Sequence, residues 1–378
     1  MTFNGELFQI FSWLSVKDLC KYSSICREAK QVLMEEFFIN KQFRNMQFVN
    51  DTGFLIEYWL DGVEFHASSR NSTEGCPVPS DSIKFLQNTG FTVVASSNGL
   101  LCLKNTADEE NRLFLFNPAT KSLLKIPLAD KLEMRDLNNI IFSCNGDEIT
   151  GEYLLMVLKS PDDWDGDFHS YFYSPEEQAW KDGHSVNLGK KNILFESSVY
   201  QNGVVYLISD WGHPFIRPYI VAYNIKNGVS RILKLPVSAS KGLQQHSKNC
   251  KLKVCNYSES IVLVKYYKSV FTLWLLDPED GSWRRIFRMR GKAMGLAENE
   301  LHVAGFTIQN GNILLVATQD KVYGYNLIEY NCVELCKHQC EDSAEFQYIY
   351  QDCIRFHSFI STLRPCGPGQ KKLFADKF

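Results

Sequence analysis

A two-stranded unit recurs along the chain with a period near 50 residues. Each copy has an apolar run, a turn that begins with a polar residue, and a second run. The five copies are Leu113–Ile126, Tyr171–Lys181, Tyr219–Leu235, Leu273–Phe287 and Lys321–Leu335. Alignment on their first turn residue gives steps of 57, 50, 53 and 49 residues between Asn117, Ser174, Asn224, Asp277 and Asn326. A strand-rich repeat of this length indicates a domain assembled from similar small β-sheets.

A second hairpin signal, an Asn-Gly turn dipeptide, precedes three of these units at Ser97–Cys102, Gln201–Tyr206 and Gln309–Leu314. Asn-Gly favours a tight turn in which the backbone adopts positive φ. Two hairpins per period make a four-stranded blade, and radial repetition of blades protects the sheet edges. The sequence therefore predicts a mostly β fold with a β-propeller.

We predict six blades, because additional strands are expected at Phe48–His66 and Phe346–Leu363, where the two ends would meet and close the ring. The clearest individual strands, rich in β-branched and aromatic residues, are Phe91–Leu103, Leu113–Phe116, Val199–Ser209, Ile261–Tyr267 and Asn312–Thr318.

The first 45 residues have a different period. Apolar residues recur at helical spacing in two stripes, Leu7, Ile10, Phe11 and Leu14, then Ile25, Ala29, Val32 and Leu33. Ser15 with Asp18 forms a capping pair that predicts the start of a helix. We therefore expect two or three short helices over residues 1–45, a propeller over 46–366 and a flexible tail over 367–378.

Composition narrows the class of protein. With 378 residues, 45% of them hydrophobic, the chain can bury a large core. Its net charge of −3 gives no reason to expect a nucleic-acid or membrane-surface partner. We see no signal peptide and no apolar run of about 18 residues, and the 12 cysteines are scattered singly. We expect an intracellular protein of the nucleus or cytoplasm, with most of its cysteines reduced.

Catalytic and metal-binding patterns are weak. The sequence has no P-loop, nucleophile elbow, paired-histidine zinc helix or dinucleotide-binding glycine pattern. Asp163, Asp165 and Asp167 alternate as in a calcium loop, but the glycine and the twelfth residue are wrong for one. The group Cys332, Cys336, His338 and Cys340 has irregular spacing for zinc. We expect no catalytic activity, no cofactor and no bound metal.

The segment Gly5–Phe43 resembles the F-box, most clearly at Ile10–Leu19 and Ile25–Arg27. Ser97–Leu103 (SNGLLCL) and Leu113–Pro127 (LFLFNPATKSLLKIP) resemble the kelch-like, F-box-associated propeller domain common in plants. In this order the two cover nearly the whole chain. The resemblance implies a substrate-recognition subunit of an SCF-type (Skp–cullin–F-box) ubiquitin ligase. The F-box of such a subunit binds a Skp-type adaptor, and through it cullin and RING subunits, while the propeller binds a target protein.

The resemblance implies adaptor contacts by residues drawn from Leu7, Ile10, Phe11, Leu14, Val16, Leu19, Ile25 and Cys26. So small a module also needs some of these side chains for internal packing, and Trp13 and Phe38 are candidates to join it to the propeller. The chain departs from the family at Phe3-Asn4, where Leu-Pro is usual, and at Ala29, where Trp is usual. The alternative is therefore a propeller scaffold with a degenerate F-box. A propeller oxidase is a third hypothesis, but it would need a metal-ligand set that we do not find in the sequence.

Candidate substrate-binding residues lie in loops and in one basic run. Aromatic and arginine side chains on loops are frequent anchors of recognition, which selects Trp164, Trp211, Phe215 and Arg217. Arg285 and Arg288 belong to the basic run Arg284–Lys292, which is either a solvated strand face or a rim that accepts an acidic or phosphorylated segment. The identity of the target is left open.

Overall fold

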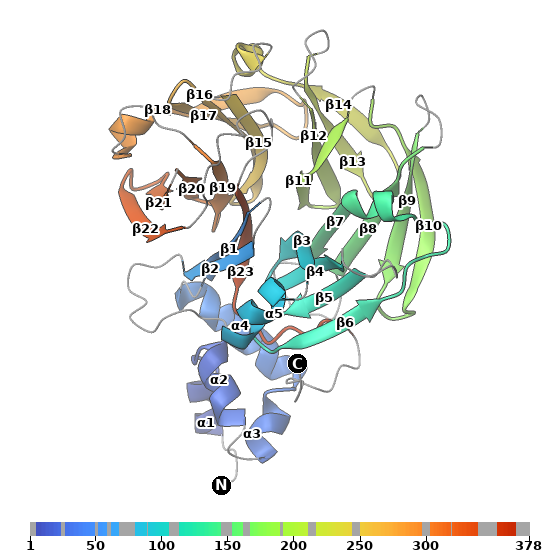
Figure 1. Ribbon diagram of the computed structural model, residues 1–378, viewed down its shortest axis with the longest axis vertical. Helices are drawn as coiled ribbons and strands as arrows, with labels where there is room; N and C mark the ends of the chain where they lie inside the picture. The colour runs from blue at the N-terminus through green and yellow to red at the C-terminus, as the bar shows by residue number, and fades with distance from the viewer. Residues whose placement is uncertain are drawn as a thin grey trace. The chain divides into compact units, whose positions relative to one another are not determined.

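The fold is described from a computed structural model (Figure 1). The described residues are 5–23, 27–49, 52–58, 62–67, 80–88, 90–105, 113–144, 153–161, 167–189, 192–210, 217–243, 250–296, 303–318, 320–338 and 354–367.

Five four-stranded sheets, here called blades 1 to 5, follow one another along the chain. Blade 1 contains β3 (Phe91–Ser97), β4 (Leu100–Asn105), β5 (Leu113–Asn117) and β6 (Ser122–Ile126). Blade 2 contains β7 (Ile140–Cys144), β8 (Tyr153–Lys159), β9 (Phe168–Ser174) and β10 (Ala179–Val186). Blade 3 contains β11 (Ile193–Gln201), β12 (Val204–Ser209), β13 (Tyr219–Asn224) and β14 (Ser230–Lys234). Blade 4 contains β15 (Cys250–Tyr257), β16 (Ser260–Tyr267), β17 (Val270–Leu276) and β18 (Trp283–Arg290). Blade 5 contains β19 (Gly305–Gln309), β20 (Ile313–Ala317), β21 (Lys321–Asn326) and β22 (Cys332–Lys337).

Among the described residues, five sheets are complete four-stranded blades, so the prediction of six is wrong. A further sheet has three strands among the described residues, in the order β2-β1-β23, where β1 is Thr52–Tyr58, β2 is Gly62–Ala67 and β23 is Ile354–Ile360. The two ends of the β region therefore meet in one sheet, as predicted. This sheet is assembled from distant segments and does not repeat the four-stranded unit.

The 50-residue repeat corresponds to the third and fourth strands of each blade. The aligned polar residue starts the turn between them and accepts main-chain hydrogen bonds. Oδ1 of Asn117 accepts from the N–H groups of Ala119 and Thr120 at 2.9 and 3.3 Å, and Asn224, Asp277 and Asn326 accept in the same way. Four residues after the aligned position the backbone has positive φ in every copy, at Lys121, Gln178, Gly228, Gly281 and Tyr330. The repeat is thus a repeated turn geometry.

The chain divides into two units with separate cores. The first is Met1–Val157, Tyr171–Asp182 and His357–Phe378, and the second is Leu158–Ser170 and Gly183–Phe356. In the first, blades 1 and 2 share one buried cluster that includes Leu100, Leu113 and Leu155. In the second, blades 4 and 5 share a cluster that includes Phe271 and Phe306, whose rings meet edge to face at 5.7 Å.

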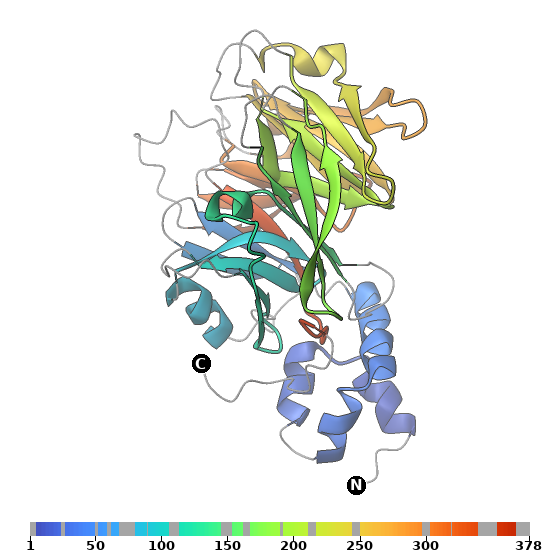
Figure 2. The same ribbon diagram turned by 90° about the vertical axis from the view of Figure 1, so that its right-hand side faces the viewer.

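In the described part of the N-terminal region four helices precede the β region, rather than the two or three predicted. They are α1 (Gly5–Phe11), α2 (Val16–Ser23), α3 (Arg27–Val32) and α4 (Glu36–Val49). Both views show them side by side in the blue part of the first unit (Figures 1 and 2). Helix α4 extends past residue 45, the predicted end of this module.

A few short helices lie within the β region. These are α5 (Ser80–Asn88), α6 (Val237–Ser240), η1 (Met134–Asn138) and η3 (Gly291–Met294). The sequence analysis did not predict α5, which packs Ile83 and Leu86 against blade 1. No helix in the described parts of the chain has the length and apolar character needed to cross a membrane.

Candidate functional site

The helices α1–α4, here called the helical module, share a buried core with the β part of the first unit. Leu33, Phe38 and Phe43 are fully buried in a cluster that also contains residues of the β region. Those residues are Ala119 in the turn between β5 and β6, Phe359 of β23, and Leu363. Phe38 therefore packs in the core that joins the module to the β region, the role suggested for it from the sequence.

Side chains of α4 donate hydrogen bonds to carbonyl groups of the turn after α1, where the chain has left the helix and these groups have no intrahelical partner. The amide of Asn45 donates to the carbonyl oxygen and hydroxyl of Ser12, and the amide of Gln42 donates to the carbonyl oxygen of Leu14. Ser12, Gln42 and Asn45 are all buried. These contacts fix the turn after α1, which sequence reasoning missed because they join residues about 30 positions apart.

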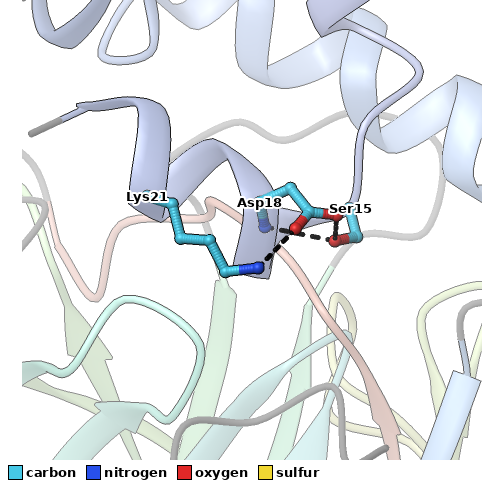
Figure 3. Close-up of polar contacts among 3 residues, drawn as sticks. All are labelled: Ser15, Asp18 and Lys21. Carbon is cyan, nitrogen blue, oxygen red and sulfur yellow. Dashed lines mark hydrogen bonds and ion pairs between the residues drawn. The ribbon is translucent and has the colours of Figure 1, made fainter. Parts of the chain in front are cut away.

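Ser15 caps α2, as the sequence predicts (Figure 3). Its hydroxyl accepts a hydrogen bond from the N–H of Asp18 at 3.2 Å and donates one to the Asp18 carboxylate at 2.8 Å. Lys21 Nζ lies 2.9 Å from the other carboxylate oxygen. The hydrogen bonds from Lys21 and then from Ser15 lower the pKa of Asp18 below its ordinary value.

The residues predicted to contact the adaptor fall into three groups by their burial. Val16 and Leu19 are fully buried in the shared core, so they hold the helices together. Leu7, Phe11 and Leu14 are half-buried, and Ile10 is exposed. Ile25 and Cys26 lie outside the described residues.

The helical module nevertheless exposes large apolar side chains. The exposed fractions are 58% for Ile10, 52% for Trp13, 41% for Tyr22 and 72% for Phe37. Phe37 stacks on Phe8 at 5.5 Å between ring centroids, and Tyr22 contacts Phe11 at 5.3 Å. Trp13, for which the sequence suggests a role in joining the module to the propeller, is exposed instead. We call Ile10, Trp13, Tyr22 and Phe37 the exposed apolar set of the module; Tyr22 and Phe37 were not among the residues selected from the sequence.

The candidate substrate residues are not gathered into one site by the described part of the chain. Arg217 is exposed just before β13, while Arg285 and Arg288 are exposed on β18. Trp164, Trp211 and Phe215 lie outside the described residues.

The candidate metal ligands are only partly described. Cys332 and Cys336 lie on β22, and Nε2 of the buried His338 is 2.9 Å from the carbonyl oxygen of Thr318. Cys340, Asp163 and Asp165 lie outside the described residues. The carboxylate of Asp167 accepts a hydrogen bond from the side-chain amide of Asn187. Within the described ranges, His, Cys, Asp and Glu side chains do not gather in any group of three that could hold a metal ion.

Comparison with known proteins identifies the β region. No curated protein matches the chain. TolB from Acinetobacter baumannii is 12% identical, with a TM-score of 0.44, over 82% of this chain and 66% of TolB, so the matched region is just under two thirds of TolB. An oligogalacturonate lyase in complex with manganese is also 12% identical, with a TM-score of 0.37, over 67% of this chain and 77% of the lyase. Neither similarity is close enough to carry an argument. The KIB1-4 beta-propeller family model matches residues 71–326, more than half of the chain, and the protein therefore belongs to the KIB1-4 β-propeller family.

Proposed function

We propose that this protein is a non-catalytic substrate-recognition subunit of an SCF-type ubiquitin ligase. The helical module is an F-box that binds a Skp-type adaptor, which connects it to cullin and RING subunits. The kelch-like propeller captures a target protein for ubiquitination. The protein acts inside the cell, in the nucleus or cytoplasm of a plant.

The observation that carries this proposal is the two-sided character of the helical module. One side is buried against Ala119, Phe359 and Leu363, and another presents Ile10, Trp13 and Phe37 to solvent. Exposed aromatic and aliphatic side chains on a small module are typical of a protein-binding surface. The F-box resemblance of Gly5–Phe43 gives the chemistry of the partner, an adaptor with an apolar binding surface.

The mechanism is positional. The chain does not need a catalytic residue for this role, because it holds a lysine of the target near a charged conjugating enzyme. Tethering replaces a bimolecular encounter with an intramolecular one and raises the effective concentration of the lysine. The shared core around Phe38 and Phe43 supports this, because it couples the module to the β region without a long flexible connection.

The test is co-purification with a plant Skp-type adaptor. The variants are Ile10→Asp and Phe37→Asp, because both side chains are exposed and their replacement leaves the buried core intact. The matched control is Ile328→Asp, which changes an apolar residue of similar exposure in the second unit. We expect the wild type and the control to retain the adaptor and both module variants to lose most of it. A folded wild type that does not bind the adaptor would refute the proposal.

A second candidate is an interaction scaffold whose F-box no longer recruits a ligase. The buried Ala29, at a position where the F-box family usually has Trp, favours it, because a family anchor is replaced here by a small internal residue. Failure of adaptor binding, with target binding retained by the propeller, would support this alternative.

A further inference from the structure

The outermost strand of blade 4, β18, carries an unbalanced positive charge. Its exposed cationic residues, with one more just after the strand, are Arg284, Arg285, Arg288, Arg290 and Lys292. Blade 4 and η3 together, Cys250 to Met294, have nine basic and four acidic residues, whereas the whole chain has a net charge of −3. The acidic residues lie in turns, at Glu259, Asp277, Glu279 and Asp280. The positive charge is therefore local to this strand.

The strand register places three of the arginines on one face. Arg285 pairs with Trp274, Arg288 with Thr272 and Arg290 with Val270. These partners alternate along β17, so their side chains share one face of the sheet, and the paired arginines share that face with them. Arg285 and Arg288 are three residues apart, which in a regular strand would place them on opposite faces. The register shift between Leu273 and Trp274 keeps both on the same face. Arg284 pairs with Leu275 and lies on the opposite face.

β18 is also an edge. It ends the order β15-β16-β17-β18 (Figure 1), and in the described ranges no other strand adjoins its outer side. An edge strand presents a row of main-chain N–H and C=O groups that can pair with an added segment. Residues two apart in an added strand are about 7 Å apart on one face. That is also the spacing of alternate residues on β18.

We propose that the β18 edge binds an extended acidic segment of a partner protein by strand addition. Carboxylates at alternate positions of that segment lie opposite Arg285, Arg288 and Arg290, where they form charge-assisted hydrogen bonds. This inference deepens the proposed function and rests on it, since it gives the chemistry of the captured target. Arginines on an edge also discourage pairing with a second copy of the chain. The experiment distinguishes this protective role from the binding of an acidic segment.

The probe is a fluorescein-labelled peptide, Gly-Ser-Glu-Val-Glu-Thr-Glu-Val-Gly, whose binding to the full chain is followed by fluorescence anisotropy. One control peptide carries Gln in place of each Glu. The other keeps the three Glu residues but places them in succession. The test variant is Arg285→Glu/Arg288→Glu/Arg290→Glu, and the matched control is Arg284→Glu on the other face. A Gln version of the triple variant repeats the test should the Glu version unfold. A single-stranded oligonucleotide competes in a separate arm.

We expect the alternating peptide to bind the wild type at low salt, and the triple variant to bind at least tenfold more weakly. Arg284→Glu should change the affinity less than about threefold, because the lost charge lies on the opposite face. Equal binding of the triple variant, of the Gln peptide or of the consecutive-Glu peptide would overturn the proposal. So would an oligonucleotide that binds through the same arginines more tightly than the peptide does. The assay contains no adaptor, so loss of peptide binding and loss of adaptor binding are measured independently.

Discussion

The side-chain amide of Asn45 donates two hydrogen bonds to Ser12, one to its carbonyl oxygen at 3.1 Å and one to its hydroxyl at 2.9 Å. Both residues are buried. The pair therefore ties α4 to the turn after α1, where a helix end would otherwise leave a carbonyl group without a partner. The orientation of α1, which carries Ile10, depends on this contact.

Asn45→Ala removes the donor and leaves polar atoms of Ser12 buried. A buried acceptor without its donor costs about 1–3 kcal/mol, so we expect the free energy of unfolding to fall by that amount. Urea unfolding followed by tryptophan fluorescence measures it. Lys41→Ala, on the same helix, is the control and should change the free energy by less than about 0.5 kcal/mol. Equal effects of the two substitutions would contradict a structural role for the Asn45–Ser12 pair.

The carboxyl group of Asp18 should give the helical module a weak pH dependence. Lys21 and Ser15 lower the pKa of Asp18 in the folded state. A lowered pKa stabilises the folded state above the ordinary value near 4, and this stabilisation is lost as the pH falls through the folded pKa. Lys21 is mostly exposed, so the ion pair contributes less than about 1 kcal/mol.

Asp18→Asn removes the titration at this site. We expect it to lower the thermal midpoint slightly at pH 7, with the difference from wild type shrinking toward pH 3. The readout is the midpoint from circular dichroism at a series of pH values and constant ionic strength. A difference that grew on acidification would show that Asp18 does not act in this way.

The repeat was predictable because its cause is local. Asn117, Asn224 and Asn326 each accept hydrogen bonds from residues two and three positions further on. The geometry is therefore contained within a few residues, and the same residue types recur wherever it is needed. For the same reason the Asn-Gly turns were predicted correctly, with positive φ at Asn98 and Gly99.

The features that sequence reasoning missed depend on distant segments. The three-stranded sheet pairs β1 with β23, about 300 residues later. The five copies of the repeat match the five blades, whereas the strands expected at the two ends were wrongly counted as a sixth blade. Likewise, the spacing of apolar residues in the helical module does not distinguish Val16, buried against the β region, from Ile10, which is exposed. Both were predicted to contact the adaptor, and only the shared core, which holds Val16 together with Phe359 and Leu363, separates them.

Cysteine reactivity should follow burial in the described parts of the chain. Burial raises the pKa of Cys20 to about 12 and the pKa values of Cys144 and Cys250 to about 11, and it also raises the pKa of Cys102. The thiolate is the reactive form, so these thiols should resist alkylation at pH 8 in the native protein. Cys336, half-buried on the outer strand β22, should react earlier.

Iodoacetamide labelling, quenched at intervals and read by peptide mass spectrometry, gives the rate at each site. Labelling in urea provides the reference in which every thiol is accessible. Faster native labelling of Cys102 than of Cys336 would contradict the packing of blade 1.

Two glycines in equivalent Asn-Gly turns should respond very differently to alanine. Gly203 has φ of 81° and its added methyl group would meet only the side chain of Lys226, at 3.9 Å. Gly203→Ala therefore has only the cost of a left-handed backbone, about 1 kcal/mol. Gly99 has φ of 84°, and its added methyl group would overlap the carbonyl oxygen of Ile360 and the side chain of Thr362. The clash adds about 1–3 kcal/mol.

We therefore expect Gly99→Ala to reduce the free energy of unfolding by at least about twice as much as Gly203→Ala. Urea denaturation of both variants under identical conditions measures the two values. Because Ile360 ends β23 and Thr362 follows it, the extra loss in Gly99→Ala reports how tightly this segment is held against the first hairpin of blade 1. Equal losses would mean that the segment moves aside at little cost, and the packing of β23 beside Gly99 would then be loose.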